Sequence, residues 1–160
     1  MFLLRLSVRS RRIEKAFEAS KPSEMLDHLG LEAYKKNGFI SVDDEHESVS
    51  KTLEYAYDDF CISTMAAAQG NKKIADEFQK RSYHFINLYD PQTKFMRARR
   101  GAQWYGPFDP SEVNFNYTEA NSWQYSFYVP QDISGLINMI GGEDKFEERL
   151  DQLFSESSQT

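Results

Sequence analysis

Several features that mark common functional classes are missing from this sequence. A single cysteine, Cys61, is present among 160 residues, so no internal disulfide can form. The chain has no CxxC pair, no HExxH motif and no glycine-rich phosphate loop. The net charge is -6 with a pI of about 5.1, and the absence of a basic stripe argues against nucleic acid binding. No apolar run approaches the length of a membrane span.

What is present indicates a helical globular chain. Hydrophobic residues make up 40% and aromatic residues 14% of the sequence, and 160 residues suffice for one domain with a core. Apolar residues recur at helical spacing and predict long helices near residues 49–69, 72–89 and 143–154, with a shorter one over 132–140. We therefore expect an all-α fold.

Local signals place the boundaries of these elements. Ile13–Ala19 has a short helical pattern, and Phe39–Val42 is predicted to be extended. Ser48 or Ser50 is a suitable cap for the first long helix, and Gly70-Asn71 should end it. Two antiparallel helices joined by so short a link predict an αα-hairpin.

Two polar regions are candidates for function outside the aromatic stretch described next. Glu54 and Asp58 are four residues apart on one helix face, which suits acid–base chemistry or a cation site, although a solvated helix surface explains them equally well. The segment 90–110 has little helical pattern, many turn signals, and several arginines and aromatics. Long irregular loops of this composition often carry function.

The most informative stretch is Tyr117–Asp132, with the sequence YTEANSWQYSFYVPQD. Aromatic residues surround one carboxylate, Glu119, and two amides, Asn121 and Gln124. Aromatic rings accept the flat CH faces of a sugar, and amides and carboxylates bond its hydroxyls. A glutamate among apolar rings also tends to stay protonated, as a general acid must at neutral pH.

A structural interpretation of the same stretch is at least as strong from the residues alone. Thr118 could cap a helix with Glu119 in its first turn, where an acid favours the helix dipole. The aromatic residues would then be buried along this helix, and Trp123 could pack in the core as readily as it could stack on a sugar. The composition by itself favours this structural interpretation.

The order of four sequence blocks resembles glycoside hydrolase family 92. These blocks are HESVSKTLEYAYDDFC at His46–Cys61, DPQTKFMRAR at Asp90–Arg99, PFDP at Pro107–Pro110, and the aromatic stretch, which is similar to the family's Y-T-E-x-N-x-W-Q-Y pattern. The resemblance extends from about Ile13 to the end of the chain, and its four blocks in one order make it specific.

The resemblance implies a fold, an activity and a cofactor. Family members are calcium-dependent exo-α-mannosidases that invert the anomeric centre and act on mannose-containing glycans, and their catalytic domain is an (α/α)6 barrel preceded by a β-sandwich. Glu119 matches the family's catalytic glutamate, so the resemblance implies that it is the general acid. Asn121, Trp123 and Gln124 are then expected to bind substrate, with Asn121 and Gln124 also candidate calcium ligands.

The same comparison predicts that the chain is a partial catalytic domain over residues 13–160. Residues 1–12 carry four arginines and no acid, have no signal-peptide pattern, and are expected to lie outside the family. The family's G-N-D-D-type motif, which holds the general base, is not found in the sequence. We therefore expect a piece of a periplasmic or secreted mannosidase that is inactive alone.

Two non-catalytic alternatives remain open at the level of sequence. A helical scaffold that binds a partner would bury the rings of Tyr117–Tyr128, whereas an enzyme would expose Glu119 in a concave site. A protein that binds sugar without hydrolysing it is the third possibility.

Overall fold

The computed structural model describes Lys15 and residues 28–155, and helices dominate this part of the chain. The elements are α2 (Leu31–Asn37), α3 (Ser48–Ala68), α4 (Lys72–Arg81), the 3-10 helix η1 (His84–Leu88), α5 (Ser122–Tyr125), α6 (Ile133–Ile140) and α7 (Glu143–Ser155). The basic start at 1–12 lies outside the described residues. So does the helix predicted at Ile13–Ala19, apart from Lys15, which is helical.

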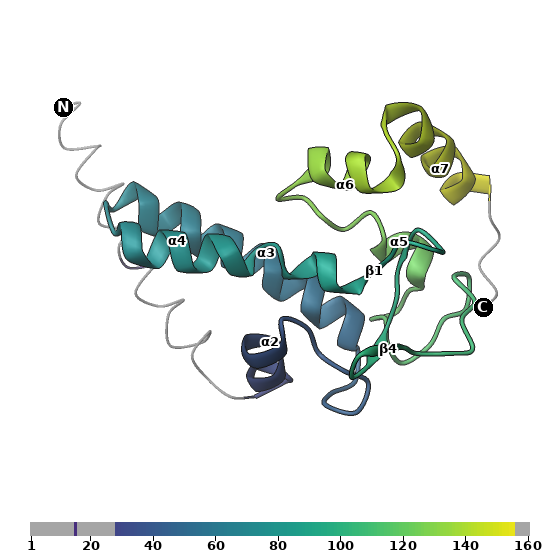
Figure 1. The fold of residues 1–160 in the computed structure, drawn as a ribbon, viewed down its shortest axis with the longest axis horizontal. Coiled ribbons are helices and arrows are strands. Elements are labelled where there is room, and N and C mark those ends of the chain that lie inside the picture. The colour runs from purple at the N-terminus through teal and green to yellow at the C-terminus, as the bar shows by residue number, and fades with distance from the viewer. Residues whose placement is uncertain (1–14, 16–27, 156–160) are drawn as a thin grey trace.

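Helices α3 and α4 form the predicted αα-hairpin, seen as the long pair of adjacent coils in Figure 1. Gly70 adopts a positive φ of 75° at the turn, and the Asn71 side chain caps α4 by accepting the amide of Ile74. Ile62 of α3 and Phe78 of α4 belong to one buried cluster between the helices. The predictions of a helix near 49–69 and of its end at Gly70-Asn71 are confirmed.

The second helix of the hairpin is shorter than predicted. The α-helix ends at Arg81, and after a turn the chain continues as the 3-10 helix η1, so the prediction of one helix over 72–89 is wrong. The reason is tertiary, because other side chains contact the carbonyls at the helix end. The hydroxyl oxygen of Tyr34 lies 3.2 Å from the Arg81 carbonyl, and the amide of Gln131 donates to the Ser82 carbonyl at 3.2 Å.

A buried ion pair ties α4 to α3 at the same place. The side chain of Asp59 is completely buried, and its two carboxylate oxygens contact the Arg81 guanidinium at 2.8 and 3.0 Å. The hydroxyl of Tyr34 on α2 donates to the same carboxylate at 2.7 Å. Three helices therefore meet at Asp59, and its charge is compensated inside the protein.

Two small antiparallel hairpins follow η1, namely β1 (Tyr89–Asp90) with β2 (Phe95–Met96), and β3 (Arg99–Arg100) with β4 (Gln103–Trp104). Asp90 accepts the amide of Gln92 at 2.9 Å and pairs with Arg97 at 3.1 Å. Burial raises the pKa of the Asp90 carboxyl, but these hydrogen bonds outweigh it, so the pKa is lowered.

The segment Phe39–Val42, predicted to be extended, is not paired into a strand of either hairpin. The amide of Val42 donates to the Arg99 carbonyl at 2.9 Å, but the chain then turns at Ser41–Asp44. The Asp44 carboxylate accepts the amide of Ser41 at 3.0 Å, and this side-chain bond takes the place of a ladder bond.

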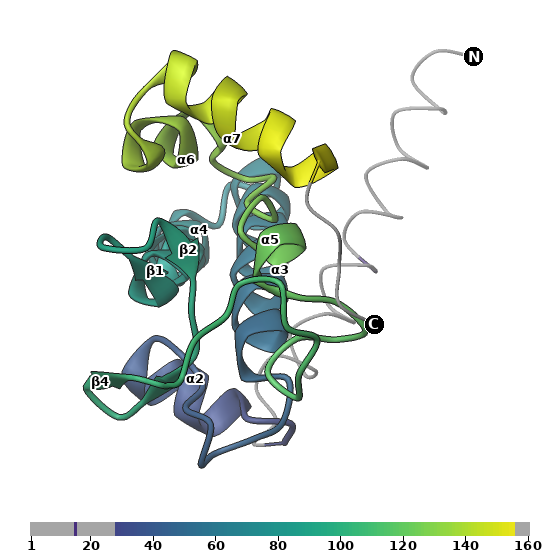
Figure 2. The ribbon, with the colours of Figure 1, turned by 90° about the vertical axis from the view of Figure 1, so that its right-hand side faces the viewer.

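The main core lies where α3, η1, the first hairpin and α6 meet. It contains Val49 and Leu53 of α3, Phe85 and Leu88 of η1, and Leu136 of α6, all fully buried. Figure 2 shows α6 and α7 at one end of this region and α2 with β4 at the other, with α5 and the long loops between them. The shorter helix predicted over 132–140 and the helix predicted at 143–154 are confirmed.

Candidate functional site

The aromatic stretch begins with a loop and not with a helix. Helix α5 starts at Ser122, and its cap is Asn121, so the interpretation of Thr118 as a cap with Glu119 in the first helical turn is wrong. The side chain of Asn121 accepts the amide of Gln124, and the side chain of Gln124 accepts the amide of Asn121. This reciprocal capping box fixes the direction in which the preceding loop enters the helix.

Glu119 is exposed to solvent and holds an unusual backbone conformation. Its φ is +50°, in the left-handed region, which a residue with a side chain adopts at a cost of about 1–2 kcal/mol. Such a conformation persists only where the surroundings enforce it, and it occurs preferentially at functional sites. Leu29, Glu47 and Lys94 also have positive φ, so the conformation of Glu119 is consistent with a functional role but does not by itself assign one.

The residue before Glu119 is held from both sides. The amide of Thr118 donates to the buried hydroxyl of Ser50 at 2.8 Å. The hydroxyl of Tyr125 on α5 lies 3.5 Å from the Thr118 carbonyl. One turn of α3 and one of α5 thus position the peptide that carries Glu119.

Tyr117 anchors the same loop to the first hairpin. Its hydroxyl donates to the Met96 carbonyl at 2.9 Å, and that carbonyl also accepts the hydroxyl of Ser122 at 2.7 Å. Burial raises the pKa of Tyr117 to about 12, so the phenol stays a hydrogen-bond donor at any physiological pH.

The loop also caps the start of α3, a role that was predicted for serines of the helix itself. Glu47 occupies the N-cap position without a side-chain capping bond, so the prediction of Ser48 or Ser50 as the cap is wrong. The amide of Glu47 donates to the Phe115 carbonyl at 2.7 Å, and that of Val49 donates to the Asn116 carbonyl at 3.1 Å. The free amides of the helix start are thereby satisfied by the loop that leads to Glu119.

The carboxylate pair on α3 lies behind this loop. The Tyr125 hydroxyl, 3.5 Å from the Thr118 carbonyl, is also 3.5 Å from a Glu54 carboxylate oxygen. Burial raises the pKa of Glu54, and the charges of Asp58 and Glu47 raise it further. The hydrogen bond from Tyr125 lowers this pKa, but the net shift is upward. Tyr125 therefore lies between Glu54 and the Thr118 peptide, which directly precedes Glu119.

The other residues predicted to bind substrate have structural contacts in this chain. Trp123 is 8% exposed and packs edge-on against Phe95 at a centroid distance of 4.7 Å, with the Arg149 guanidinium 5.0 Å from its ring. Asn121 is buried, while Gln124 is exposed beside it. The structure thus brings these three residues together within α5 and its cap, next to Glu119 in sequence, and their role in binding substrate stays a prediction.

A cleft of about 390 Å³ opens beside the loop and is lined by the segments 42–46, 97–108 and 112–117. We call it the loop cleft. The aromatic side chains in its lining are Tyr105, Phe108, Phe115 and Tyr117, and the charged ones are Glu45, Arg97, Arg100 and Glu112. Glu119 itself is not in the lining, although the loop that carries it forms one wall.

The structure does not provide a ready-made calcium site in this part of the chain. Within the described residues, no three His, Cys, Asp or Glu side chains lie close enough together to hold a metal ion. The side-chain oxygens of Asn121 and Gln124 each accept a backbone amide in the capping box. Each amide oxygen keeps a second lone pair, so the expectation that Asn121 and Gln124 are calcium ligands stays a prediction.

Comparison with known protein families identifies the chain. The model of the glycosyl hydrolase family 92 catalytic domain matches residues 6–160. The chain belongs to this family. The match begins seven positions before Ile13, where the sequence resemblance was expected to start, so it includes part of the basic segment.

Solved structures of family 92 enzymes are similar to this chain in both fold and sequence. An α-mannosidase of Bacteroides thetaiotaomicron is 41% identical with a TM-score of 0.85, over 91% of this chain and 20% of that protein. An inverting mannosidase from the same organism is 34% identical with a TM-score of 0.82, over 87% of this chain and 20% of its own length.

A relative from the fungus Arthroderma benhamiae is described as an uncharacterized secreted glycosidase, and is 29% identical over 157 residues. The match covers 78% of this chain and 20% of the relative. The chain thus spans about 20% of the length of each of these proteins. No helix among the described residues is both long and apolar enough to cross a membrane.

Family 92 membership accounts for the helical architecture. The prediction of an all-α fold that is part of an (α/α)6 barrel is confirmed, since the similar structures are family 92 proteins with such a barrel. The short β hairpins belong to the long connection between η1 and α5.

Sequence reasoning missed the residues that hold Glu119 in place. Ser50 was considered only as a helix cap, and Tyr125 only as one of several aromatics. Their contacts with Thr118 join residues 68 and 7 positions apart, and no local pattern signals them. The aromatic and arginine content of segment 90–110 did point to a functional loop, and that loop lines the loop cleft.

Proposed function

We propose that this chain is part of the catalytic domain of an inverting α-mannosidase that releases terminal mannose from glycans. Family membership and the mannosidase activity named for two similar structures support the substrate class. Glu119 is the general acid, and it protonates the glycosidic oxygen as the leaving sugar departs. Asn121, Trp123 and Gln124 contribute to substrate binding around it.

The match of Glu119 to the catalytic glutamate of the family, within a chain that belongs to that family, carries this proposal, and its exposed position is consistent with the role. An exposed glutamate at φ +50°, next to a peptide fixed by Ser50 and Tyr125, has its carboxyl group held out from the fold at a cost in stability. A glutamate that served only to start a helix would lie within α5, and Glu119 lies three residues before it.

An inverting mechanism needs a second carboxylate, which activates water on the opposite face of the sugar, roughly 6.5–9.5 Å from the acid. The sequence has no G-N-D-D-type motif to supply this base.

Calcium dependence is part of the proposal by family resemblance, with the ion supplying a Lewis acid for substrate hydroxyls. Because the described residues form no ligand cluster, no step is assigned to the ion. Chelation of the complete enzyme and re-addition of calcium tests this part.

The similarity to a secreted relative also supports a location for the complete protein. The fungal relative is described as secreted. We propose that the complete protein is exported.

The helical scaffold and the sugar-binding protein without hydrolytic activity are both disfavoured. A helical scaffold predicted that the rings of Tyr117–Tyr128 are buried, but Tyr128 is exposed and Tyr125 and Phe127 are only partly covered. A sugar-binding protein without hydrolytic activity is disfavoured by the mannosidase activity named for two similar structures. The buried rings of Tyr117 and Trp123 serve the fold under all three hypotheses.

Replacement of Glu119 by glutamine in the complete enzyme tests the proposal. The substitution keeps the size and hydrogen bonding of the side chain but removes the transferable proton, so activity on a mannose disaccharide should fall by about 10²–10⁴-fold. An activated aryl mannoside needs little protonation of its leaving group and should lose far less. Glu147→Gln, an equally exposed change on α7, serves as the control and should leave both rates unchanged. Equal losses on both substrates, together with a lower melting temperature, would assign Glu119 a structural role.

A further inference from the structure

We propose that the backbone of Met96, on the first hairpin, positions the catalytic acid by holding both ends of its loop through the hydroxyls of Tyr117 and Ser122. We call the segment 117–122 the acid loop. The inference rests on the proposed role of Glu119, which lies within this loop. It assigns positioning roles to Tyr117 and Ser122, two buried residues that act through Glu119.

Two hydroxyls from opposite ends of the acid loop bond the same carbonyl oxygen. The Tyr117 hydroxyl donates to the Met96 carbonyl at 2.9 Å, and the Ser122 hydroxyl donates to it at 2.7 Å. A carbonyl oxygen has two lone pairs, so these two bonds use its full capacity as an acceptor. The start and the end of the acid loop are therefore fixed at one point of the core.

The amide of Met96 adds a third bond to the same region. It donates to the hydroxyl oxygen of Ser126 at 2.8 Å, and the backbone amide of Ser126 donates to the Ser122 carbonyl at 2.9 Å. We call the bonds of Met96 to Tyr117, Ser122 and Ser126 the Met96 tether. Met96 and Ser122 are completely buried, and Tyr117 and Ser126 are 4% exposed. The tether is therefore complete within the described residues and needs no cover from other parts of the protein.

The tether restricts the backbone on which Glu119 is carried. Only four residues lie between Tyr117 and Ser122, so fixing both of these residues leaves the intervening backbone few conformations. The φ of Glu119 is +50°, in a region that a residue with a side chain keeps only where its surroundings enforce it. The tether supplies this restraint at both ends of the loop, and the bond from Thr118 to Ser50 supplies it in between.

The hairpin that carries Met96 is itself fixed, so it can serve as a support. The ion pair of Arg97 with Asp90, at 3.1 Å, links its two strands. Arg149 of α7 donates to the Lys94 carbonyl at 2.9 Å, and its guanidinium lies 3.8 Å from the centroid of the Phe95 ring. A support that is ordered before substrate arrives reduces the entropy lost when the acid is aligned.

The inference also accounts for a sequence block that the proposed chemistry does not use. The block at Asp90–Arg99 is one of the four that resemble family 92, and β2 with Met96 lies within it. Its composition predicted a functional loop. The Met96 tether gives this block a role in catalysis that needs no contact with the substrate.

Tyr117→Phe in the complete enzyme tests the positioning role. The substitution keeps the buried ring and removes only the hydroxyl that bonds Met96. Displacement of a catalytic group by about 1 Å costs up to about 10²-fold, so loss of one end of the tether should lower kcat on a mannose disaccharide by about tenfold, with KM changed by less than about twofold. An activated aryl mannoside depends little on the acid and should lose less than about threefold.

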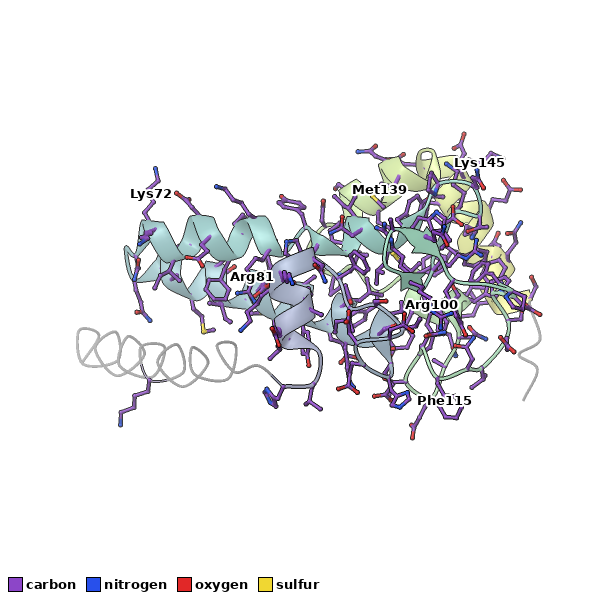
Figure 3. The ribbon with its side chains drawn as sticks, turned by 60° about the horizontal axis from the view of Figure 1, so that its bottom comes forward. Lys72, Arg81, Arg100, Phe115, Met139 and Lys145 are labelled. Atoms are coloured by element: carbon purple, nitrogen blue, oxygen red, sulfur yellow. The ribbon has the colours of Figure 1, made fainter. Side chains whose placement is uncertain are left out.

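Tyr89→Phe is the matched control on the same hairpin. Tyr89 is 9% exposed, and its hydroxyl donates to the Met139 carbonyl of α6 at 2.9 Å. Met139 and Phe115, which lies two residues before the acid loop, are on opposite sides of the molecule (Figure 3). Tyr89→Phe should lower the melting temperature to a similar extent and leave the ratio of the two rates unchanged. An equal loss on both substrates in Tyr117→Phe, or no loss of kcat, would overturn the positioning role.

Ser122→Ala removes the other end of the tether and covers the case in which Tyr117→Phe does not fold. It should show the same selective loss on the disaccharide. Its control is Ser82→Ala, because Ser82 is equally buried and its hydroxyl donates to the Gln79 carbonyl at 2.7 Å, at the end of α4. A selective loss in both serine variants would contradict the inference.

Hydrogen exchange separates this inference from the proposed function. The amides of the acid loop in the complete protein should exchange about fivefold faster in Tyr117→Phe than in the wild type, and at the wild-type rate in Tyr89→Phe. Faster exchange supports the tether even if Glu119→Gln shows no dependence on the leaving group, a result that would count against the proposed function alone. Unchanged exchange, in an enzyme in which Glu119→Gln has its expected effect, would overturn the tether and leave the proposed function standing.

Discussion

The buried hydroxyl of Ser50 on α3 accepts the backbone amide of Thr118 at 2.8 Å, one residue before the proposed catalytic acid. The contact joins the first turn of a core helix to a strained loop. Its strength as a hydrogen bond matters less than its position, because the backbone conformation of Glu119 at φ +50° depends on what holds its neighbours.

We expect Ser50→Ala to reduce catalysis in the complete enzyme through the position of Glu119. The change leaves the Thr118 amide without its partner and should lower the free energy of unfolding by about 1–3 kcal/mol. It should lower kcat on mannobiose more than it raises KM, as measured by steady-state kinetics with denaturant unfolding in parallel.

Ser63→Ala provides the matched control for this effect. Ser63 is buried on the same helix, and its hydroxyl donates to the Ala75 carbonyl at 2.8 Å, far from the loop. It should cost similar stability and leave kcat unchanged. If both variants lose stability and neither loses kcat, Ser50 has no part in positioning the acid.

Glu54 should give the protein a measurable dependence of stability on pH. Burial raises its pKa above the ordinary value of 4.5, so the folded state binds this proton more tightly than the unfolded state does. The free energy of unfolding should therefore decrease as the pH rises from 4.5 through the folded-state pKa. Glu54→Gln removes this contribution, so the variant should gain stability relative to the wild type over that window, and the difference should be constant below it. A difference that does not vary with pH would show that Glu54 is fully solvated.

The ion pair of Asp59 and Arg81 should be essential to the helical hairpin. Asp59 has no exposed surface, and its removal leaves a mostly buried guanidinium, so Asp59→Asn should lower the free energy of unfolding by about 3 kcal/mol. Asp43→Asn breaks a pair whose side chains are 61% and 58% exposed and should cost less than about 0.5 kcal/mol. Denaturant titration of both variants makes the comparison, and equal costs would contradict the assigned burial.

The 160-residue chain alone should not hydrolyse α-mannosides at an enzyme-like rate. The prediction rests on the missing G-N-D-D-type motif, because protonation without activation of water gives little catalysis. An assay of the purified chain with an activated aryl mannoside and calcium checks it. Calcium-dependent turnover that disappears in Glu119→Gln would show that the chain holds its own base.

The periodic helices were predictable from sequence, and the particular contacts around the site were not. Val49, Leu53 and Ala56 repeat at helical spacing and placed α3 to within a residue at each end. The end of α4 at Arg81 depends on contacts of Tyr34 and Gln131, which the local sequence does not show. Side chains distant in sequence there outweigh helix propensity.

The candidate site likewise has features that the sequence predicted and features that it did not. Glu119 was found because its neighbours form a distinctive pattern. It is exposed, but it is not in the lining of the loop cleft, so the concave site expected around it stays a prediction. Its left-handed backbone was not predicted, since Glu has no preference for that conformation and tertiary bonds to Thr118 impose it.

The capping of α3 by the carbonyls of Phe115 and Asn116 also bears on the order of folding. Ser48 and Asn116, which meet at this cap, are 68 residues apart in the chain, so the first turn of the helix cannot be completed until both hairpins and the loop have formed. Contacts over such separations form late because closing the intervening chain costs entropy. In a protein emerging from the ribosome, α3 would thus acquire its fixed start only after the acid-bearing loop has been synthesised, and the helix and the catalytic loop would mature in a single step.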